Sequence, residues 1–118
     1  MKIENKNIKE VKLAVEPDHW RREKLVEAVV TAGASVSPID EASGLIWADP
    51  SRPELLPNLL ASNLEWVQLP FAGIEPFLPM LDDQRTWTCG KGVYSQPVAE
   101  HVLGSILALK RGFITYAR

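Results

Sequence analysis

The sequence is poor in cysteine, in basic runs and in long apolar stretches, and each shortage excludes a class of protein. It has one cysteine, Cys89, so no disulfide can form within the chain, which favours a reducing compartment. With a formal net charge of −2 and no basic block, the chain is not expected to bind nucleic acid. The N-terminus lacks the apolar core of a signal peptide, and no apolar run reaches the ~20 residues of a membrane span. A cytoplasmic protein without membrane contact is therefore expected.

The composition is that of one globular domain. The chain has 118 residues, of which 46% are hydrophobic and 24% are charged. These proportions are typical of a folded chain rather than a disordered one. The length is sufficient for one hydrophobic core of ordinary size.

Short apolar runs predict five strands, and helical patterns lie between most of them. A helix is predicted after the first run, with Asp18 as its N-cap and Gly33 just beyond its last turn. Short helical segments are expected at 53–62, where Pro57 interrupts the pattern, and at 73–81. The predicted strands are 11–15, 35–39, 44–48, 66–69 and 86–89.

Strands that alternate with helices indicate a mostly parallel sheet with helices on both faces. We therefore predict an α/β fold of the flavodoxin-like, doubly wound type with a five-stranded sheet. One connection is difficult to accommodate. Only residues 40–43 separate the second and third predicted strands, which is short for a crossover between parallel strands.

The last part of the chain predicts a helix with a wide apolar face. Ser95 is its expected N-cap, and Pro97 lies in the first turn, where a missing N–H costs nothing. So wide an apolar surface must be buried. Two possibilities remain open: the helix packs on its own sheet, or it packs on a further domain or a second copy. The two apolar rows consist of Val98, Val102, Ile106 and Leu109, and of Ala99, Leu103 and Leu107.

Three stretches of the chain carry motifs that occur together in one family. They are GLIWADP at 44–50, LEWVQLPFAGIEPFL at 64–78 and PVAEHVLGSILALKRGF at 97–113. The last resembles the segment that ends the first lobe of the D-2-hydroxyacid dehydrogenases. The second is similar to that family's strand, AGI or AGV, and turn. The first resembles the tryptophan-bearing loop of its glyoxylate/hydroxypyruvate reductase-like branch.

The resemblance implies a two-lobed oxidoreductase that interconverts 2-keto and 2-hydroxy acids. Residues 1–95 would form the substrate-binding lobe, and residues 96–118 the helix that crosses to a Rossmann lobe and contributes to a homodimer. NAD or NADP would bind to that absent lobe, because the only G-x-G, at 90–92, lacks the third glycine of a dinucleotide fingerprint. The family's catalytic residues also belong there. The chain alone is expected to be inactive, and Arg118 is expected to lie at the lobe boundary.

A turn around Gly73 is the expected substrate-carboxylate site. Gly73 would allow a strand to turn into a short helix, exposing its own N–H and that of Ile74. Adjacent N–H groups at a helix start can bind an anion. By resemblance they would hold the substrate carboxylate, while Ala72 leaves the approach open. An ordinary strand-to-helix turn is the alternative.

Two aromatic residues are further candidates for the substrate pocket. Trp47 ends the third predicted strand, where open α/β sheets place ligands, and by resemblance it favours small acids. A core tryptophan is the alternative. Tyr94 stands where formate-dehydrogenase-like members have an asparagine, so it departs from that branch but offers a hydroxyl. No metal site is predicted, since the two histidines and Cys89 fit no ligand spacing.

Two other classes of function remain open. A stand-alone, non-catalytic binding or dimerisation domain would use the terminal helix as its interface. A receiver-like signalling module would hold Mg²⁺ on acids at strand ends, here Glu16, Asp18 and Asp49, with Lys91 after the fifth strand. Pro17 and Pro50 interrupt the loops that such a module needs.

Overall fold

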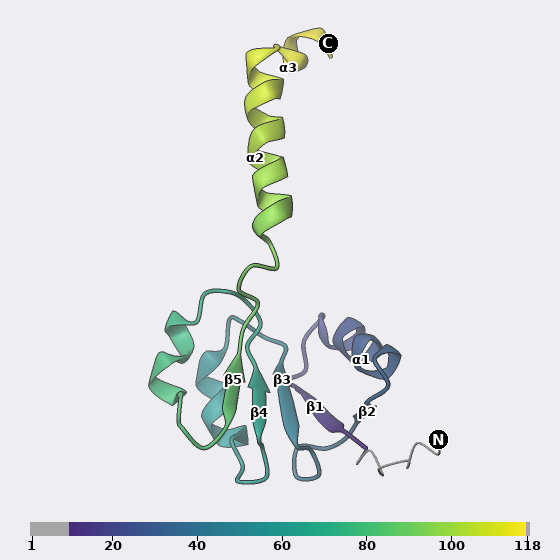
Figure 1. The fold of residues 1–118 in the computed structure, drawn as a ribbon, viewed down its shortest axis with the longest axis vertical. Helices are drawn as coiled ribbons and strands as arrows, with labels where there is room; N and C mark the ends of the chain where they lie inside the picture. Colours follow the sequence, from purple (N-terminus) through teal and green to yellow (C-terminus); the bar gives the residue numbers. More distant parts are fainter. Residues whose placement is uncertain (1–9, 118) are drawn as a thin grey trace, which may run out of the picture.

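The computed structural model describes residues 10–117, which form a five-stranded sheet covered on both faces and one long helix that projects from it (Figure 1). The strands are β1 (Lys12–Glu16), β2 (Ser35–Val36), β3 (Gly44–Trp47), β4 (Trp66–Gln68) and β5 (Thr86–Thr88). The α-helices are α1 (Arg22–Thr31), α2 (Ser95–Lys110) and α3 (Phe113–Tyr116), and the 3₁₀ helices are η1 (Pro53–Leu59) and η2 (Glu75–Met80).

The sheet confirms the predicted fold. Its strand order is β2-β1-β3-β4-β5, and every neighbouring pair is parallel. This is the flavodoxin-like order, and the sheet is wholly rather than mostly parallel. Four residues pair side by side across four neighbouring strands: Leu13 with Gly44, Gly44 with Trp66, and Trp66 with Thr86.

The short connection between β2 and β3 is explained by the register. Leu13 of β1 lies opposite Val36, the last residue of β2, and also opposite Gly44, the first residue of β3. The chain therefore leaves β2 and enters β3 at the same level of the sheet. It has only to pass around β1 and needs no helix to return along the length of a strand.

Alternating side chains supply a core on each face of the sheet. One face carries Leu45 and Val67, which pack with Leu56 of η1 and Phe77 of η2. The other face carries Val15 with Ala48, which pack against α1. The strands thus have an apolar residue on both sides, as expected for a parallel sheet between helical layers.

Several predicted boundaries differ from the structure. Helix α1 begins at Arg22, so Asp18 is not its N-cap, whereas Gly33 does follow the helix end with φ +87°. Helix α2 begins at Ser95 itself, because the Tyr94 carbonyl accepts the first helical bond, from the N–H of Val98, at 3.0 Å. Ser95 is therefore not the N-cap.

The segment 53–62 is helical only in part. Its η1 helix contains Pro57 and has the tighter 3₁₀ form. Proline has no N–H to donate and its ring crowds the preceding turn, so a regular α-helix is not formed there.

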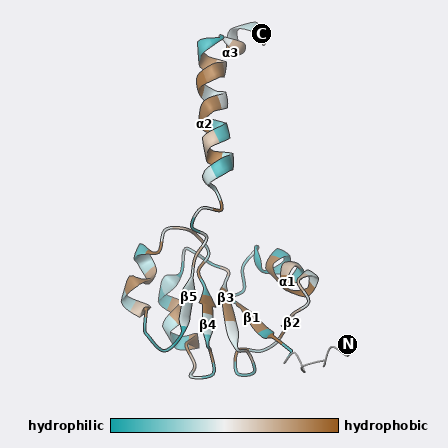
Figure 2. Ribbon diagram, in the orientation of Figure 1, coloured by the Kyte–Doolittle hydropathy of each residue, from teal (hydrophilic) through white to brown (hydrophobic). Residues whose placement is uncertain are grey.

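Helix α2 does not pack on its own sheet. It points away from the strands, and none of its residues is buried (Figure 1). Apolar residues run along it, as the brown segments in Figure 2 show, and Ile106 and Leu109 are 55% and 74% exposed. The radius of gyration is 19.7 Å, whereas a compact domain of this length has about 13 Å. Of the two possibilities that the sequence left open, packing on the sheet is excluded in this structure.

No helix within residues 10–117 is both long enough and apolar enough to cross a bilayer.

Candidate functional site

A pocket of about 540 Å³ opens where β3 and β4 end. One side is the start of α1, and the other is the segment between β5 and α2. Parallel strands bring their carboxyl ends to one edge of a sheet, and ligands bind outside that edge where the chain reverses direction across the sheet. Here the reversal lies between β1 and β3, so the pocket is beside the place where this fold binds ligands.

The start of α1 gives this pocket a positive charge. Arg21, just before the helix, and Lys24, in its first turn, both line the pocket, and no carboxylate of residues 10–117 does. The Arg21 guanidinium lies 5.0 Å from the ring centroid of Trp20 and 4.7 Å from that of Phe71, so stacking on both rings positions it. Within residues 10–117, Arg21 forms no ion pair. The pocket can therefore attract an anion.

Two of the predicted site residues meet in this pocket. Trp47 lines it from the end of β3, and Tyr94 lines it from the segment before α2. Trp47 is also 1% exposed and belongs to the core, and its indole N–H is buried and has no partner among the described residues. It is thus a core tryptophan that also forms part of the pocket wall. Tyr94 is 52% exposed, so its ring is accessible to a ligand.

The other three predicted residues lie outside the pocket. Ala72 and Gly73 are exposed, and Ile74 precedes η2 and accepts a hydrogen bond from the N–H of Phe77 at 2.8 Å. Gly73 does not have a positive φ, and a Cβ built there meets only the Glu75 Oε2 atom, at 3.0 Å. The backbone therefore does not require glycine at this turn. The predicted reason for Gly73 is wrong, and its role with Ile74 as carboxylate donors stays a prediction.

Sequence reasoning missed the residues that α1 contributes. Trp20 and Arg21 immediately precede α1, Lys24 lies in its first turn, and all three line the pocket at the strand ends. The available signal was the close spacing of an aromatic residue and two cations immediately after β1. That signal was weak, because charged residues are common on exposed helix faces.

A buried carboxylate stabilises the loops beside the pocket. Asp49, 2% exposed, accepts hydrogen bonds from the Ser51 hydroxyl at 2.6 Å, the Ser51 N–H at 2.9 Å and Nε of Arg52 at 2.6 Å. Nε2 of His19 lies 3.9 Å away. The Ser51 hydroxyl, with the Arg52 guanidinium, holds the pKa of Asp49 well below its usual range. Arg52 also donates to the Asp18 carbonyl, so Asp49 and Arg52 link the loops after β3 and β1.

The same contacts leave Asp49 unsuited to the role of a phosphoacceptor. Both of its oxygens already accept hydrogen bonds. In the part of the chain that the structure describes, no three or more acidic, histidine or cysteine side chains gather where a metal could bind. The receiver-like alternative therefore has no support in this geometry.

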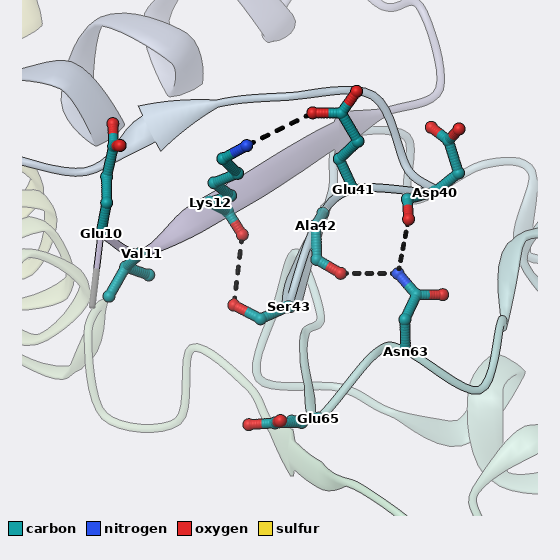
Figure 3. A pocket seen from close by; sticks show the side chains of 9 residues that line it. All are labelled: Glu10, Val11, Lys12, Asp40, Glu41, Ala42, Ser43, Asn63 and Glu65. Carbon is teal, nitrogen blue, oxygen red and sulfur yellow. Dashed lines mark hydrogen bonds and ion pairs between the residues drawn. The ribbon is translucent and has the colours of Figure 1, made fainter.

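A second hollow, of about 630 Å³, lies at the opposite edge of the sheet (Figure 3). Lys12 pairs with Glu41 at 3.3 Å, and the Asn63 amide donates to the Ala42 carbonyl at 2.7 Å. The other carboxylates around it, those of Glu10, Asp40 and Glu65, point in different directions rather than toward one point. This hollow has the character of a solvated acidic surface.

Comparisons of the chain with protein-family models, with curated proteins and with solved structures find no match. The resemblance to the dehydrogenases therefore depends on the three motifs alone.

Proposed function

We propose that this chain is the substrate-binding lobe of an NAD(P)-dependent D-2-hydroxyacid dehydrogenase, a 2-keto acid reductase, and that it is inactive alone. The observation that carries the proposal is the pocket at the carboxyl ends of β3 and β4. It is positively charged, no carboxylate of residues 10–117 lines it, and it includes Trp47, which a motif predicts for the substrate site, together with the ring of Tyr94. A 2-keto or 2-hydroxy acid is an organic anion, which a positively charged pocket with apolar walls suits.

The pocket residues would bind and orient the acid rather than transform it. The cations at the start of α1 attract its carboxylate, and the buried ends of β3 and β4 form a rigid wall against which it is positioned. Hydride transfer would come from NAD or NADP. The described residues do not fit that cofactor: Gly90 and Gly92 lie in the segment before α2, and Ser95 occupies the third glycine position of the fingerprint. We therefore assign no cofactor to this chain.

The uncovered apolar surface of helix α2 supports a second copy of this chain as the partner, in a homodimer. Its apolar residues and those of α3 form one uncovered surface, whose members are 52% to 84% exposed. A surface of this kind is typical of an interface. Two copies could pair these helices and remove both surfaces from water at once. A cytoplasmic location agrees with the single cysteine.

A titration followed by NMR tests the proposed substrate. Pyruvate is expected to shift the backbone amide signals of Ile46, Trp47 and Tyr94 in a saturable way, whereas the neutral pyruvamide is not. Tyr94→Ala should weaken the binding, because it removes a ring that lines the pocket. Tyr116→Ala is the matched control, since Tyr116 is 84% exposed on α3 and lies outside the pocket.

Two results would contradict this function. One is the absence of any pocket shift with pyruvate; the other is an equal response to pyruvamide. A stand-alone dimerisation domain is the second candidate, favoured by the uncovered face of α2. A stable dimer that binds no 2-keto acid would support that candidate instead.

A further inference from the structure

The pocket has a cationic side and an apolar side. Arg21 and Lys24 supply the charge from α1. Opposite them, Ile46 and Leu69 at the strand ends and Val93 before α2 supply apolar surface. A ligand that satisfies both sides has one anionic end and an apolar body.

The cationic side is prepared for a carboxylate. The Arg21 guanidinium lies over the rings of Trp20 and Phe71, and these cation–π contacts favour its position before a ligand arrives. A guanidinium in a fixed position can donate two parallel hydrogen bonds to a carboxylate. Lys24 is three residues further along α1, which places it on the same side of the helix. The turn at Gly73 and Ile74 does not line the pocket.

Apolar side chains at the rim of the pocket are uncovered, and the pocket is roomy. Trp20 is 73% exposed, Val93 is 67% exposed and Tyr94 is 52% exposed, and all three border the pocket. They come from opposite sides of it, the start of α1 and the segment before α2. The volume of about 540 Å³ falls within the ~300–1,000 Å³ of pockets that enclose drug-sized ligands. Glyoxylate or pyruvate would leave most of this space and surface unused.

We infer that the acid bound by this lobe is a 2-oxo acid with a bulky apolar side chain, whose carboxylate is held by Arg21 and Lys24. The inference rests on the proposed function and specifies its substrate. The apolar side chain lies between the strand ends and the rim formed by Trp20, Val93 and Tyr94. The Gly73 turn does not hold the carboxylate in this arrangement.

A graded series of ligands tests this inference on the whole chain. Pyruvate, 4-methyl-2-oxopentanoate and phenylpyruvate share the 2-oxo acid group and differ in the apolar side chain. The branched acid buries three more carbon atoms than pyruvate, so we expect it to bind at least about tenfold more tightly. 2-Oxoglutarate, with a second carboxylate in place of the apolar end, should bind no better than pyruvate.

Charge variants test the assigned carboxylate ligands. Arg21→Gln should weaken the binding of every acid by about tenfold or more, because a charged hydrogen bond is lost. Lys24 is exposed, so Lys24→Gln removes a pocket charge without disturbing packing and should weaken binding severalfold. Lys110→Gln removes an equally exposed charge on α2 and should leave binding unchanged. Circular dichroism checks that each variant is folded.

The outcomes separate this inference from the proposed function. If pyruvate binds in the pocket as tightly as the branched acid, the function stands and the apolar substrate is wrong. If both pocket variants bind like Lys110→Gln, the carboxylate assignment is wrong. If no 2-oxo acid binds to the pocket, the function and the inference both fail. Affinity that rises with side-chain size and falls in both pocket variants is the result that supports it.

Discussion

Replacing Gly44 with alanine is expected to destabilise the sheet by about 2–4 kcal/mol. Gly44 lies in β3 between Leu13 of β1 and Trp66 of β4. A Cβ at this position would be 2.6 Å from Cε3 of Trp66 and 2.7 Å from Cδ2 of Leu13. Carbon atoms in contact prefer ~3.5–4.0 Å, so both neighbours would have to move by about 1 Å.

Neither neighbour can move freely. The Trp66 indole N–H donates to Oγ1 of Thr88 at 2.8 Å, so shifting the ring breaks that bond. Leu13 packs against the α1 side of the sheet. Overpacking of a core costs about 1–3 kcal/mol, and a lost hydrogen bond costs about 1 kcal/mol more.

Urea unfolding followed by tryptophan fluorescence measures this effect, because all four tryptophans lie outside α2. With a slope of ~2 kcal/mol per molar urea, in the middle of the range for small proteins, the midpoint should fall by about 1–2 M. Gly104→Ala is the control, since a Cβ on that exposed helical glycine meets nothing within 4 Å. Adding Leu13→Ala should restore part of the loss in Gly44→Ala. A midpoint for Gly44→Ala equal to that of Gly104→Ala would refute the steric explanation.

Two further substitutions test the loop carboxylate and the projecting helix. Asp49→Asn should lower the free energy of unfolding at neutral pH, and urea titrations at several pH values should show its difference from the wild type shrinking below about pH 4. The sign follows from the lowered pKa: the contribution of Asp49 is full above the unfolded pKa and is lost as the pH falls through the folded one. A difference that persists unchanged to the lowest pH would contradict this. If the chain forms the proposed dimer, Ile106→Glu should convert it to a monomer in analytical ultracentrifugation, while His101→Glu, which adds the same charge on the polar face of α2, should not. Equal behaviour of the two variants would exclude the apolar face as the interface.

Much of the fold could be predicted because its signals are local. The apolar runs gave all five strands within a few residues of their observed bounds. What failed depends on contacts that a local pattern does not contain. Asp18 resembles an N-cap, yet the Arg52 side chain donates to its carbonyl and α1 begins only at Arg22. The connection from β2 to β3 appeared too short until the pairing register with β1 was known.

The pocket was less predictable for the same reason. Trp47 could be expected there because strand ends in this fold lie beside the ligand site. Arg21 could not, because its position depends on Phe71, which is fifty residues away in the chain. The glycine at 73 suggested a backbone constraint that its observed conformation does not impose. The motif resemblance therefore predicted at which edge of the sheet the pocket lies, but not the side chains that give the pocket its positive charge.

Because α2 is separate from the sheet, the molecule consists of two units that differ greatly in how easily their backbone hydrogen bonds open. The core amides of the sheet become accessible to water only when the sheet domain unfolds as a whole, whereas an uncovered helix of 16 residues is at the margin of stability in water. Deuterium should therefore enter the amides of α2 long before those of β1, β3 and β4. Any partner that covers the helix would slow that entry without changing the sheet. The hydrogen-exchange rate of the α2 amides therefore reports whether a partner covers the helix, even when that partner has not been identified.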